Sequence, residues 1–168
     1  NRRNTIFCVE RESDRYPEKI AVHKGMPRKL WYMGRMPDPN RKSVAIVGAR
    51  RSTAYGNAMA KLFAEHLAEA GVQIISGMAW GIDSYAHEGA LRADGDTCGV
   101  DVCYPAGQRH LYECLKEKGG ILSEQPPGRS PLAGFFPARN RIISALSDLV
   151  LVVEAREKSG SLITADFA

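Results

Sequence analysis

Residues 43–56 read SVAIVGARRSTAYG, and the fold class follows from this stretch. Its first half, Val44–Val47, is an uninterrupted apolar run that ends at Gly48. Such a run is typical of a strand buried on both faces, as in a parallel sheet. A polar turn follows, and beyond it apolar residues recur at helical spacing until Gly71, which predicts a helix that stops there. The stretch therefore predicts a unit of strand, turn and helix.

The same alternation of strand and helix continues through the rest of the sequence. We expect further strands over residues 72–76, 97–100, 120–123 and 149–153. We expect helices after Gly81, around residues 110–118 and around Ile142–Leu146, the last of them following a proline-rich loop over residues 125–137. This alternation predicts an open parallel sheet with helices on both faces, that is, a Rossmann-like α/β fold.

Residues 1–42 follow a different pattern. Prolines recur in this segment and prevent a long helix, while Leu30–Met33 predicts a short strand that packs on the main body. We therefore expect a basic N-terminal extension, residues 1–42, and a Rossmann-like domain, residues 43–168. The chain begins at Asn1 rather than Met and ends at Ala168 inside an expected helix, so we expect a domain that is incomplete at its C-terminus.

Composition excludes several classes of protein. Of the 168 residues 44% are hydrophobic and 25% charged, which is too apolar for a disordered chain. There is no run of about 20 apolar residues, so we expect no membrane span, and the charged, proline-broken start is unlike a signal peptide. The four cysteines are too few and too scattered for a disulfide framework and form no C-x-x-C pair. They favour reduced thiols in a cytoplasmic protein and do not support a zinc site.

The charge is distributed unevenly along the chain. The whole sequence carries a net charge of +4, but residues 1–51 hold 13 Lys or Arg against 5 Asp or Glu, a net charge of +8. The remainder holds 10 against 14, a net charge of −4. This asymmetry predicts a polyanionic partner near the first third of the chain, with a solvated basic surface as the alternative.

Polar residues and glycines gather at the predicted carboxyl ends of the strands, where open parallel sheets bind their ligands. They are Gly48, Arg50, Arg51 and Ser52 after the first buried strand, Ser76, Gly77 and Gly81 after the second, and Ser159, Gly160 and Ser161 after the last. A helix begins at each of these places, and the unpaired N–H groups of helix N-termini favour anions such as phosphate. Arg50 adds a bidentate guanidinium suited to phosphate oxygens. We therefore expect a phosphate-binding site at this edge.

Residues 134–141, GFFPARNR, combine aromatic and basic side chains at the start of a predicted helix. The candidates here are Phe135, Phe136, Arg139, Asn140 and Arg141. Arginines can hold a nucleic acid backbone while aromatic rings stack on its bases, which is the chemistry of single-strand binding. That one of the two phenylalanines fills the core instead stays open.

Nothing in the sequence compels a catalytic function. Asp83 and His87 share a helix face, but a capping Asp and a structural His are the simpler interpretation. Glu154, after the last strand, is equally able to act as a base or to orient a loop. Neither G-x-G-x-x-G after the first strand nor G-x-x-x-x-G-K-[ST] occurs, so the two common nucleotide fingerprints are absent. We therefore expect no catalytic residue, no metal ligand and no cofactor.

Four spaced motifs resemble the DNA-processing protein A (DprA/Smf) family. They are VAIVGAR at 44–50, SGMAWGID at 76–83 with Ala86-His87, FPARNRIIS at 136–144, and VEA at 153–155 with SGSLITA at 159–165. The resemblance covers about residues 16–168. It implies an extended Rossmann-like domain that binds single-stranded DNA, protects incoming DNA and helps to load the RecA recombinase during natural transformation. It also implies a homodimer.

The resemblance further implies roles for particular residues. Arg50 matches the arginine of the first glycine turn, which lines the DNA pocket in the family, and Phe135, Phe136 and Arg139 match its DNA-contacting loop. One departure lies at Val100–Asp101, where family members carry an L-G-x-G turn and this sequence has none. Either the turn is deleted, which would alter the DNA site, or residues are omitted from this numbering, which we favour. The family also continues beyond Ala168 and often adds a winged-helix module.

Two other functions stay open. A nucleoside-monophosphate phosphoribohydrolase has a similar sheet, but such enzymes carry P-G-G-x-G-T-x-x-E, which is absent here. A protein-interaction scaffold with an unused anion site would bind the recombinase and leave DNA unbound. We expect single-stranded DNA, the RecA recombinase and a second copy of the chain as partners, and no membrane.

Overall fold

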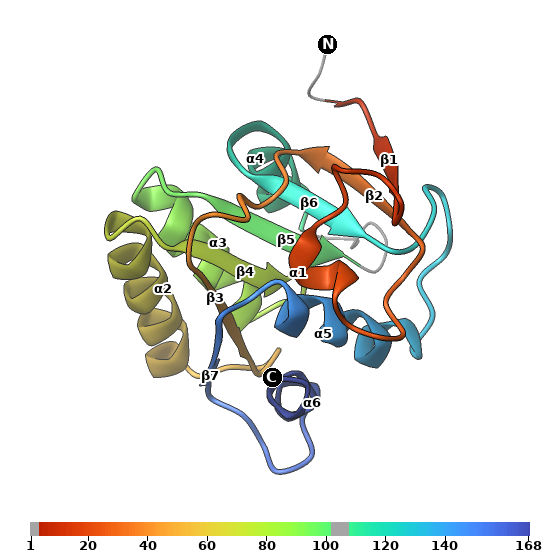
Figure 1. The fold of residues 1–168 in the computed structure, drawn as a ribbon. Helices are drawn as coiled ribbons and strands as arrows, with labels where there is room; N and C mark the ends of the chain where they lie inside the picture. Colours follow the sequence, from red (N-terminus) through yellow and green to blue (C-terminus); the bar gives the residue numbers. More distant parts are fainter. Residues whose placement is uncertain (1–3, 102–107) are drawn as a thin grey trace.

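In the computed structural model the described residues, 4–101 and 108–168, form a seven-stranded sheet flanked by helices (Figure 1). The strands are β1 (Phe7–Glu10), β2 (Lys29–Gly34), β3 (Ser43–Gly48), β4 (Gln73–Gly77), β5 (Thr97–Asp101), β6 (Gly120–Ser123) and β7 (Leu149–Val153). The helices are α1 (Glu18–Ala21), α2 (Ala54–Glu69), α3 (Ile82–Arg92), α4 (Arg109–Lys118), α5 (Phe135–Ala145) and α6 (Gly160–Asp166). The predicted Rossmann-like α/β fold is confirmed.

The sheet is mixed rather than wholly parallel. Its strand order is β1-β2-β6-β5-β4-β3-β7, and β3 to β7 run parallel to one another, as predicted. The strand expected at Leu30–Met33 is confirmed as β2, but it pairs antiparallel with β6, and β1 pairs antiparallel with β2. The expectation of a parallel sheet throughout is therefore wrong for these two strands. An antiparallel partner needs no crossover helix, so the short proline-broken segment before β3 is able to supply both.

The apolar run of β3 is buried on both faces because its side chains alternate between two cores. Val44 and Ile46 pack with the alanines of α2 and α3, whereas Ala45 and Val47 pack with residues of α1 and α5. The helices α2, α3 and α4 thus cover one face, and α1, α5 and α6 lie on the other (Figure 1). The prediction of helices on both faces is confirmed.

Helix α2 buries small side chains rather than the large apolar ones that mark it in the sequence. Its buried positions are Gly56 and three alanines, while Leu62 and Phe63 are 41% and 42% exposed. The small face allows a close approach to α3, where a Cβ added at Gly89 would collide with the carbonyl oxygen of Lys61. The helical spacing of apolar residues therefore predicts the position of α2 correctly, but it does not predict which face of the helix is buried.

One predicted boundary and the expected burial of the last strand are wrong in the last third of the chain. The proline-rich loop ends before Phe135, because α5 begins there and holds Pro137 in its first turn. Proline is tolerated in a first turn because the N–H that it lacks would have no intrahelical partner there. Strand β7 pairs with β3 and borders the described part of the sheet, so Leu149 is 61% exposed rather than buried.

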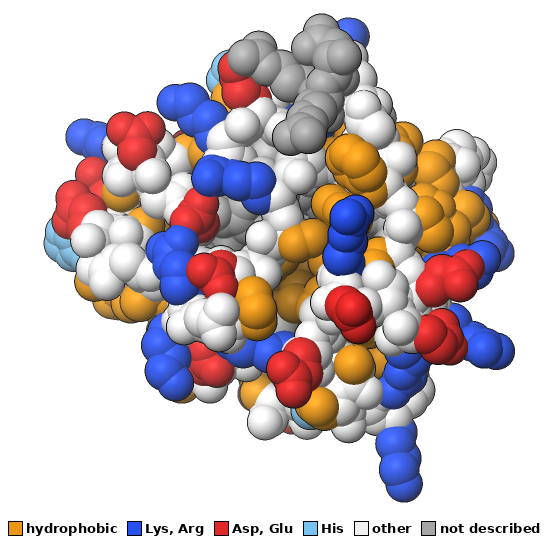
Figure 2. Space-filling model, turned by 45° about the horizontal axis from the view of Figure 1, so that its top comes forward, with side chains coloured by type: hydrophobic (Ala, Val, Ile, Leu, Met, Phe, Trp, Pro, Cys, Tyr) orange, Lys and Arg blue, Asp and Glu red, His pale blue; other side chains and the backbone are white. Residues whose placement is uncertain are grey.

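Many cations of the N-terminal segment are engaged within the fold. Arg11 donates to the carbonyl oxygen of Ala21 (2.7 Å). The Nζ atom of Lys19 forms an ion pair with Oδ2 of Asp148, the residue before β7 (3.0 Å). Lys and Arg side chains are interspersed with Asp and Glu on the face seen in Figure 2, so this face does not present a continuous basic surface.

Three further expectations concern a membrane span, a metal site and the junction at Val100–Asp101. None of the helices in the described part of the chain is long and apolar enough to cross a membrane. Residues 4–101 and 108–168 also contain no group of three or more His, Cys, Asp or Glu side chains that could hold a metal ion. The chain departs from the family pattern directly after Val100, but residues 102–107 lie outside the described residues, so the choice between a deletion and an omission stays a prediction.

Candidate functional site

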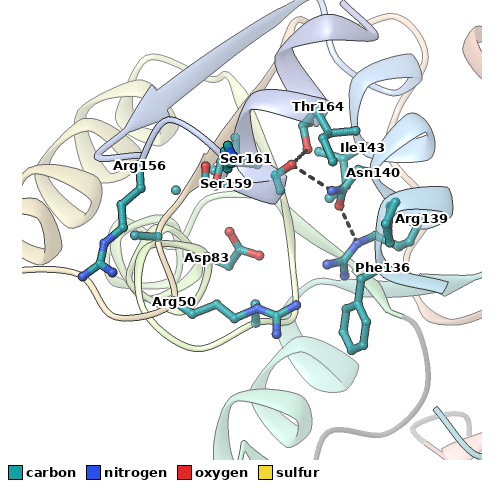
Figure 3. A pocket seen from close by; sticks show the side chains of 18 of the residues that line it. Arg50, Asp83, Phe136, Arg139, Asn140, Ile143, Arg156, Ser159, Ser161 and Thr164 are labelled. Carbon is teal, nitrogen blue, oxygen red and sulfur yellow. Dashed lines mark hydrogen bonds between the residues drawn. The ribbon is translucent and has the colours of Figure 1, made fainter. Parts of the chain in front are cut away.

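A cleft of about 650 Å³ opens at the carboxyl ends of β3 and β7 (Figure 3). Strands β4, β5 and β6 follow one another on one side of β3, and β7 pairs with β3 on its other side. The strand order therefore reverses at β3, and the cleft lies at this switch point. Open α/β sheets bind their ligands at such a point, because successive loops separate there and leave a crevice. The loop after β3, the start of α5 and the start of α6 form its walls.

Nine of the residues predicted from the sequence line this cleft. They are Gly48, Arg50, Arg51, Phe136, Arg139, Asn140, Ser159, Gly160 and Ser161. They come from three segments that are far apart in the sequence and that the sheet brings together. The placement of the remaining six is different, as described below.

The ring of Phe136 lies close to two guanidinium groups (Figure 3). Arg50, from the loop after β3, lies over the ring with its Cζ atom 4.7 Å from the ring centroid. Arg139, one helical turn further along α5, has its Cζ atom 5.8 Å from the same centroid. Cations at these distances interact favourably with an aromatic face. The cleft therefore combines one aromatic surface with two groups that bind phosphate oxygens bidentately.

Arg139 is a buried cation that the fold holds in one position. Its side chain is buried, its Nη1 atom donates to the carbonyl oxygen of Val100 (2.6 Å), and its Nε atom donates to Asn140 Oδ1 (3.1 Å). Burial lowers the pKa of Arg139, while the neighbouring carboxylates of Asp83 and Asp101 oppose that shift by favouring the charged form. An arginine held in this way presents its charge to the cleft without a large loss of side-chain entropy on binding.

Asp83 supplies the negative charge in the wall of the cleft. It lies in the first turn of α3 and is 6% exposed. Burial raises the pKa of Asp83 to about 6, an effect that is partly offset by Arg139 and by a hydrogen bond from the backbone of Ala79. The carboxyl group therefore changes its charge close to neutral pH, next to the cations of the cleft.

A hydrogen bond joins the two helices that border the cleft on one side. Asn140 Nδ2, on α5, donates to the carbonyl oxygen of Gly160 (3.0 Å) at the start of α6 (Figure 3). Next to it, the hydroxyl of Ser159 is buried and has no hydrogen-bond partner within the described residues. Buried hydroxyl groups are normally hydrogen-bonded, so this one is available to a ligand.

Two cations of the cleft were missed by reasoning from the sequence. Arg156 and Lys158 lie in the loop between β7 and α6, are exposed, and line the cleft together with Arg50, Arg51 and Arg139. Their position directly after the last predicted strand was the signal that could have identified them. With them, the lining residues include five cationic side chains and one carboxylate, that of Asp83.

The N-terminus of α2 does not face a vacant anion site. The backbone N–H and the hydroxyl of Thr53 both donate to the carboxylate of Glu154, at 3.0 and 2.8 Å, and Thr53 itself accepts from the N–H of Gly56. Glu154 adopts a φ of +63°, in the left-handed region, where it caps the helix. Of the three helix starts expected to bind phosphate, this one is therefore occupied by a carboxylate of the chain itself.

Four predicted residues support the cleft or lie beside it. Ser76 is fully buried and donates to the carbonyl oxygen of Ile46 (2.6 Å), and the hydroxyl of Ser52 is hydrogen-bonded to Asn57. Gly77 and Gly81 provide close approaches. A Cβ at Gly77 would collide with Asp83, and one at Gly81 would lie 2.5 Å from the carbonyl oxygen of Arg50.

The last two predicted residues face away from the cleft. Phe135 lies under the guanidinium of Arg129, at 5.0 Å from its Cζ atom, and does not line the cleft. Arg141 forms a bidentate ion pair with Glu124, at 2.8 and 2.7 Å, and this hydrogen bonding raises its pKa. Neither phenylalanine fills the core, because both side chains are half-buried, and of the two only Phe136 lines the cleft.

The fold and the site together define a Rossmann-like α/β protein with a cationic, aromatic-lined cleft at its switch point. A sequence profile of the family described as "DNA recombination-mediator protein A" matches residues 7–168. The chain belongs to this family. The resemblance to DprA/Smf proteins that the motifs indicate is thereby confirmed.

Individual relatives agree with this assignment. The chain is 41% identical over 175 residues to Protein Smf of Synechocystis sp., an alignment that covers 99% of this chain and 44% of the relative. The solved structure of DNA processing protein A from Streptococcus pneumoniae matches with a TM-score of 0.88 at 34% identity, over 97% of this chain and 59% of that one.

A second solved structure is that of DNA processing protein A from Helicobacter pylori, whose description concerns a single-stranded DNA binding mode. It matches with a TM-score of 0.85 at 34% identity, over 98% of this chain and 76% of that one. The present chain spans about half the length of the curated relatives that it matches.

Proposed function

We propose that the chain binds single-stranded DNA in the cleft at the carboxyl ends of β3 and β7, and that it acts in DNA recombination as a binding protein rather than as an enzyme. In this proposal residues 43–168 form the DNA-binding domain and residues 1–42 are an extension of it. The observation that carries the proposal is the ring of Phe136 within 6 Å of the guanidinium groups of Arg50 and Arg139, inside a cleft that five cationic side chains line.

The arrangement assigns separate tasks to charged and aromatic groups. Arg50, Arg51, Arg156 and Lys158 are exposed or half-exposed at the cleft and are able to follow successive phosphates. The ring of Phe136 offers a surface on which a base can stack. Ser159 adds a hydroxyl without a partner among the described residues, suited to a base edge or a phosphate oxygen.

Stacking on Phe136 favours single strands over duplexes. In a duplex each base is covered by its neighbours on both faces, so a protein ring reaches a base face only where the strand is unpaired. The related Helicobacter pylori protein, described as binding single-stranded DNA, supports the same substrate for this chain.

We further propose the wider role that the family resemblance implies. The intact protein protects incoming DNA, helps to load the RecA recombinase during natural transformation, forms a homodimer and works in the cytoplasm. The description of the family as a DNA recombination mediator supports this role. Its test is recombinase filament assembly on oligonucleotides coated with single-strand-binding protein, which the intact protein accelerates if the proposal holds.

The central experiment compares Arg50→Glu with Arg92→Glu. Both changes alter the net charge equally, but Arg92 lies at the opposite end of α3 from the cleft and pairs with Glu65. Binding of a labelled oligothymidylate is measured across a salt series. Arg50→Glu is expected to weaken binding at least about tenfold and to flatten the slope of log K against log salt by about 0.7, since one phosphate contact on a single strand is lost. Arg92→Glu is expected to bind like the wild-type chain.

Equal binding by the two variants would contradict the assignment of the cleft. The wild-type chain is also expected to bind single-stranded oligonucleotides more tightly than duplexes of the same length. Release of adenine from AMP, which a phosphoribohydrolase would catalyse, is the assay that separates the enzymatic alternative from this proposal.

A further inference from the structure

A second aromatic ring lies beside the cleft and is exposed to solvent. Trp80 belongs to the short turn between β4 and α3 and is 56% exposed. Within the described residues, its ring has no aromatic or cationic stacking partner, in contrast to Phe135 and Phe136, which each lie under an arginine. Exposure of an indole ring to water costs free energy in proportion to the apolar area that is exposed.

The turn that carries Trp80 is held on both sides. Met78, two residues earlier, is 3% exposed, and its carbonyl oxygen accepts a hydrogen bond from Gln108 Nε2 (3.4 Å). Gly81, the next residue, adopts a φ of +80° and packs against the backbone of Arg50. The N–H of Ile82 donates to the carbonyl oxygen of Ala49 (3.2 Å). The exposed ring therefore projects from a fixed backbone.

Exposed arginines belong to both segments that contact this turn. Arg50 and Arg51 belong to the loop against which Gly81 packs, and Arg109 follows Gln108 at the start of α4. Neither Arg51 nor Arg109 forms an ion pair with any described residue. Ala79, directly before the ring, lines the cleft itself. The turn that carries Trp80 is thus in contact with the Arg50–Arg51 loop through Gly81 and with Gln108, the residue before Arg109, through Met78.

We propose that Trp80 is a second base-stacking position for single-stranded DNA, on the continuation of the strand that leaves the Phe136 cleft past Arg50 and Arg51. The inference rests on the proposed function. An exposed ring on a held backbone, with cations in the segments that contact its turn, suits a base whose flanking phosphates pair with those cations. A protein-docking site would instead need a continuous apolar surface, whereas the segments that contact this turn expose arginines.

The chain provides an internal reporter for this inference. It has two tryptophans, Trp31 and Trp80, and Trp31 lies half-buried on β2. The Trp31→Phe variant therefore reports on Trp80 alone, and the Trp80→Phe variant on Trp31 alone. Both are titrated with oligothymidylates of about 4 and about 15 nucleotides, which span the usual site sizes of single-strand-binding domains. A base stacked on an indole ring quenches its fluorescence, so the long oligonucleotide is expected to quench the Trp31→Phe variant and not the Trp80→Phe variant.

Affinity measurements add a second readout. Trp80→Ala is expected to weaken binding of the long oligonucleotide about 5- to 100-fold, to leave the short one nearly unaffected and to leave the salt slope unchanged. Trp80→Phe restores most of the affinity because it keeps an aromatic face. Phe63→Ala, which removes an exposed ring from the middle of α2, is the matched control and is expected to bind like the wild-type chain.

The outcomes separate this inference from the proposed function. If the Trp31→Phe variant binds the long oligonucleotide with wild-type affinity and its fluorescence is unchanged, the second stacking position is overturned. The same holds if Trp80→Ala binds as tightly as Phe63→Ala while Arg50→Glu binds weakly, and in both cases the Phe136 cleft stands. If the wild-type chain binds neither oligonucleotide, the proposed function fails, and this inference fails with it.

Discussion

Replacement of Phe136 by alanine tests the stacking chemistry of the cleft most directly. The side chain lies in the first turn of α5, with Arg50 over its ring at 4.7 Å and Arg139 at 5.8 Å. Its neighbour Phe135 provides a matched control, because it has the same side chain one residue earlier but lies under Arg129 outside the cleft. Both variants lose one aromatic ring from the same helical turn.

The expected loss follows from the contacts of the ring. A base that stacks on an aromatic side chain contributes about 1–3 kcal/mol. In the free protein Arg50 already lies over the ring, an interaction of about 0.5–1 kcal/mol at an exposed site, and a base that takes that face must replace it. The difference is about 0.5–2 kcal/mol, so Phe136→Ala should weaken binding about 2- to 30-fold.

The assay is fluorescence anisotropy of a labelled oligothymidylate at several salt concentrations. Because Phe136 carries no charge, the variant should lower the affinity equally at each salt concentration and keep the wild-type slope. Phe136→Tyr should retain most of the affinity. The reasoning is refuted if Phe135→Ala loses as much affinity as Phe136→Ala, or if Phe136→Ala binds like the wild-type chain.

Three further predictions concern the walls of the cleft. Since burial raises the pKa of Asp83 to about 6, DNA affinity should rise as the pH falls from about 7 to about 5 and the carboxylate takes up a proton, and Asp83→Asn should remove that step from a binding titration against pH. Gly77→Ala would place a methyl group against Asp83 and 3.0 Å from Arg139 Cζ, so urea denaturation should show a loss of about 1–3 kcal/mol in the free energy of unfolding, together with weaker DNA binding. Glu154→Ala removes the acceptor for Thr53 at the start of α2, which should lower the free energy of unfolding by about 1 kcal/mol in the same measurement.

The parallel part of the sheet could be predicted because its apolar runs leave few alternatives. A run such as Val44–Val47 has side chains that must be buried on both faces, and only a strand between two helical layers provides this. Strand β1 carries no such signal, since Val9 is its one buried residue, and α1 has four residues. Strand β1 forms because β2, which pairs with β6 on its other side, offers it an edge, and α1 forms because Ile20 is buried in the core. Both are tertiary effects and not local ones.

The start of α5 explains which predicted residues reach the cleft. With the helix beginning at Phe135, the side chains of Phe136, Arg139, Asn140 and Ile143 fall at positions i, i+3, i+4 and i+7, which share one face, and all four line the cleft. Arg141 is two residues from Arg139 and therefore points to the opposite side, where it meets Glu124. The sequence alone does not fix this choice, because the residues were expected to form a loop that leads into a helix.

The net charge of a segment predicts a partner only when the charges that ion pairs and hydrogen bonds within the fold already engage are left out of the count. Several cations of residues 1–51 are engaged by the fold, as Arg41 is by Asp96, and the net-acidic remainder supplies Arg156 and Lys158 to the cleft. The salt dependence of DNA binding should therefore reflect the five cations of the cleft and Arg109, and not the other 11 cations of the first 51 residues. With about 0.7 counterions released per phosphate contact on a single strand, the slope of log K against log salt should be no steeper than about −4. A slope near −8 would mean that the basic extension, rather than the cleft, makes most of the phosphate contacts.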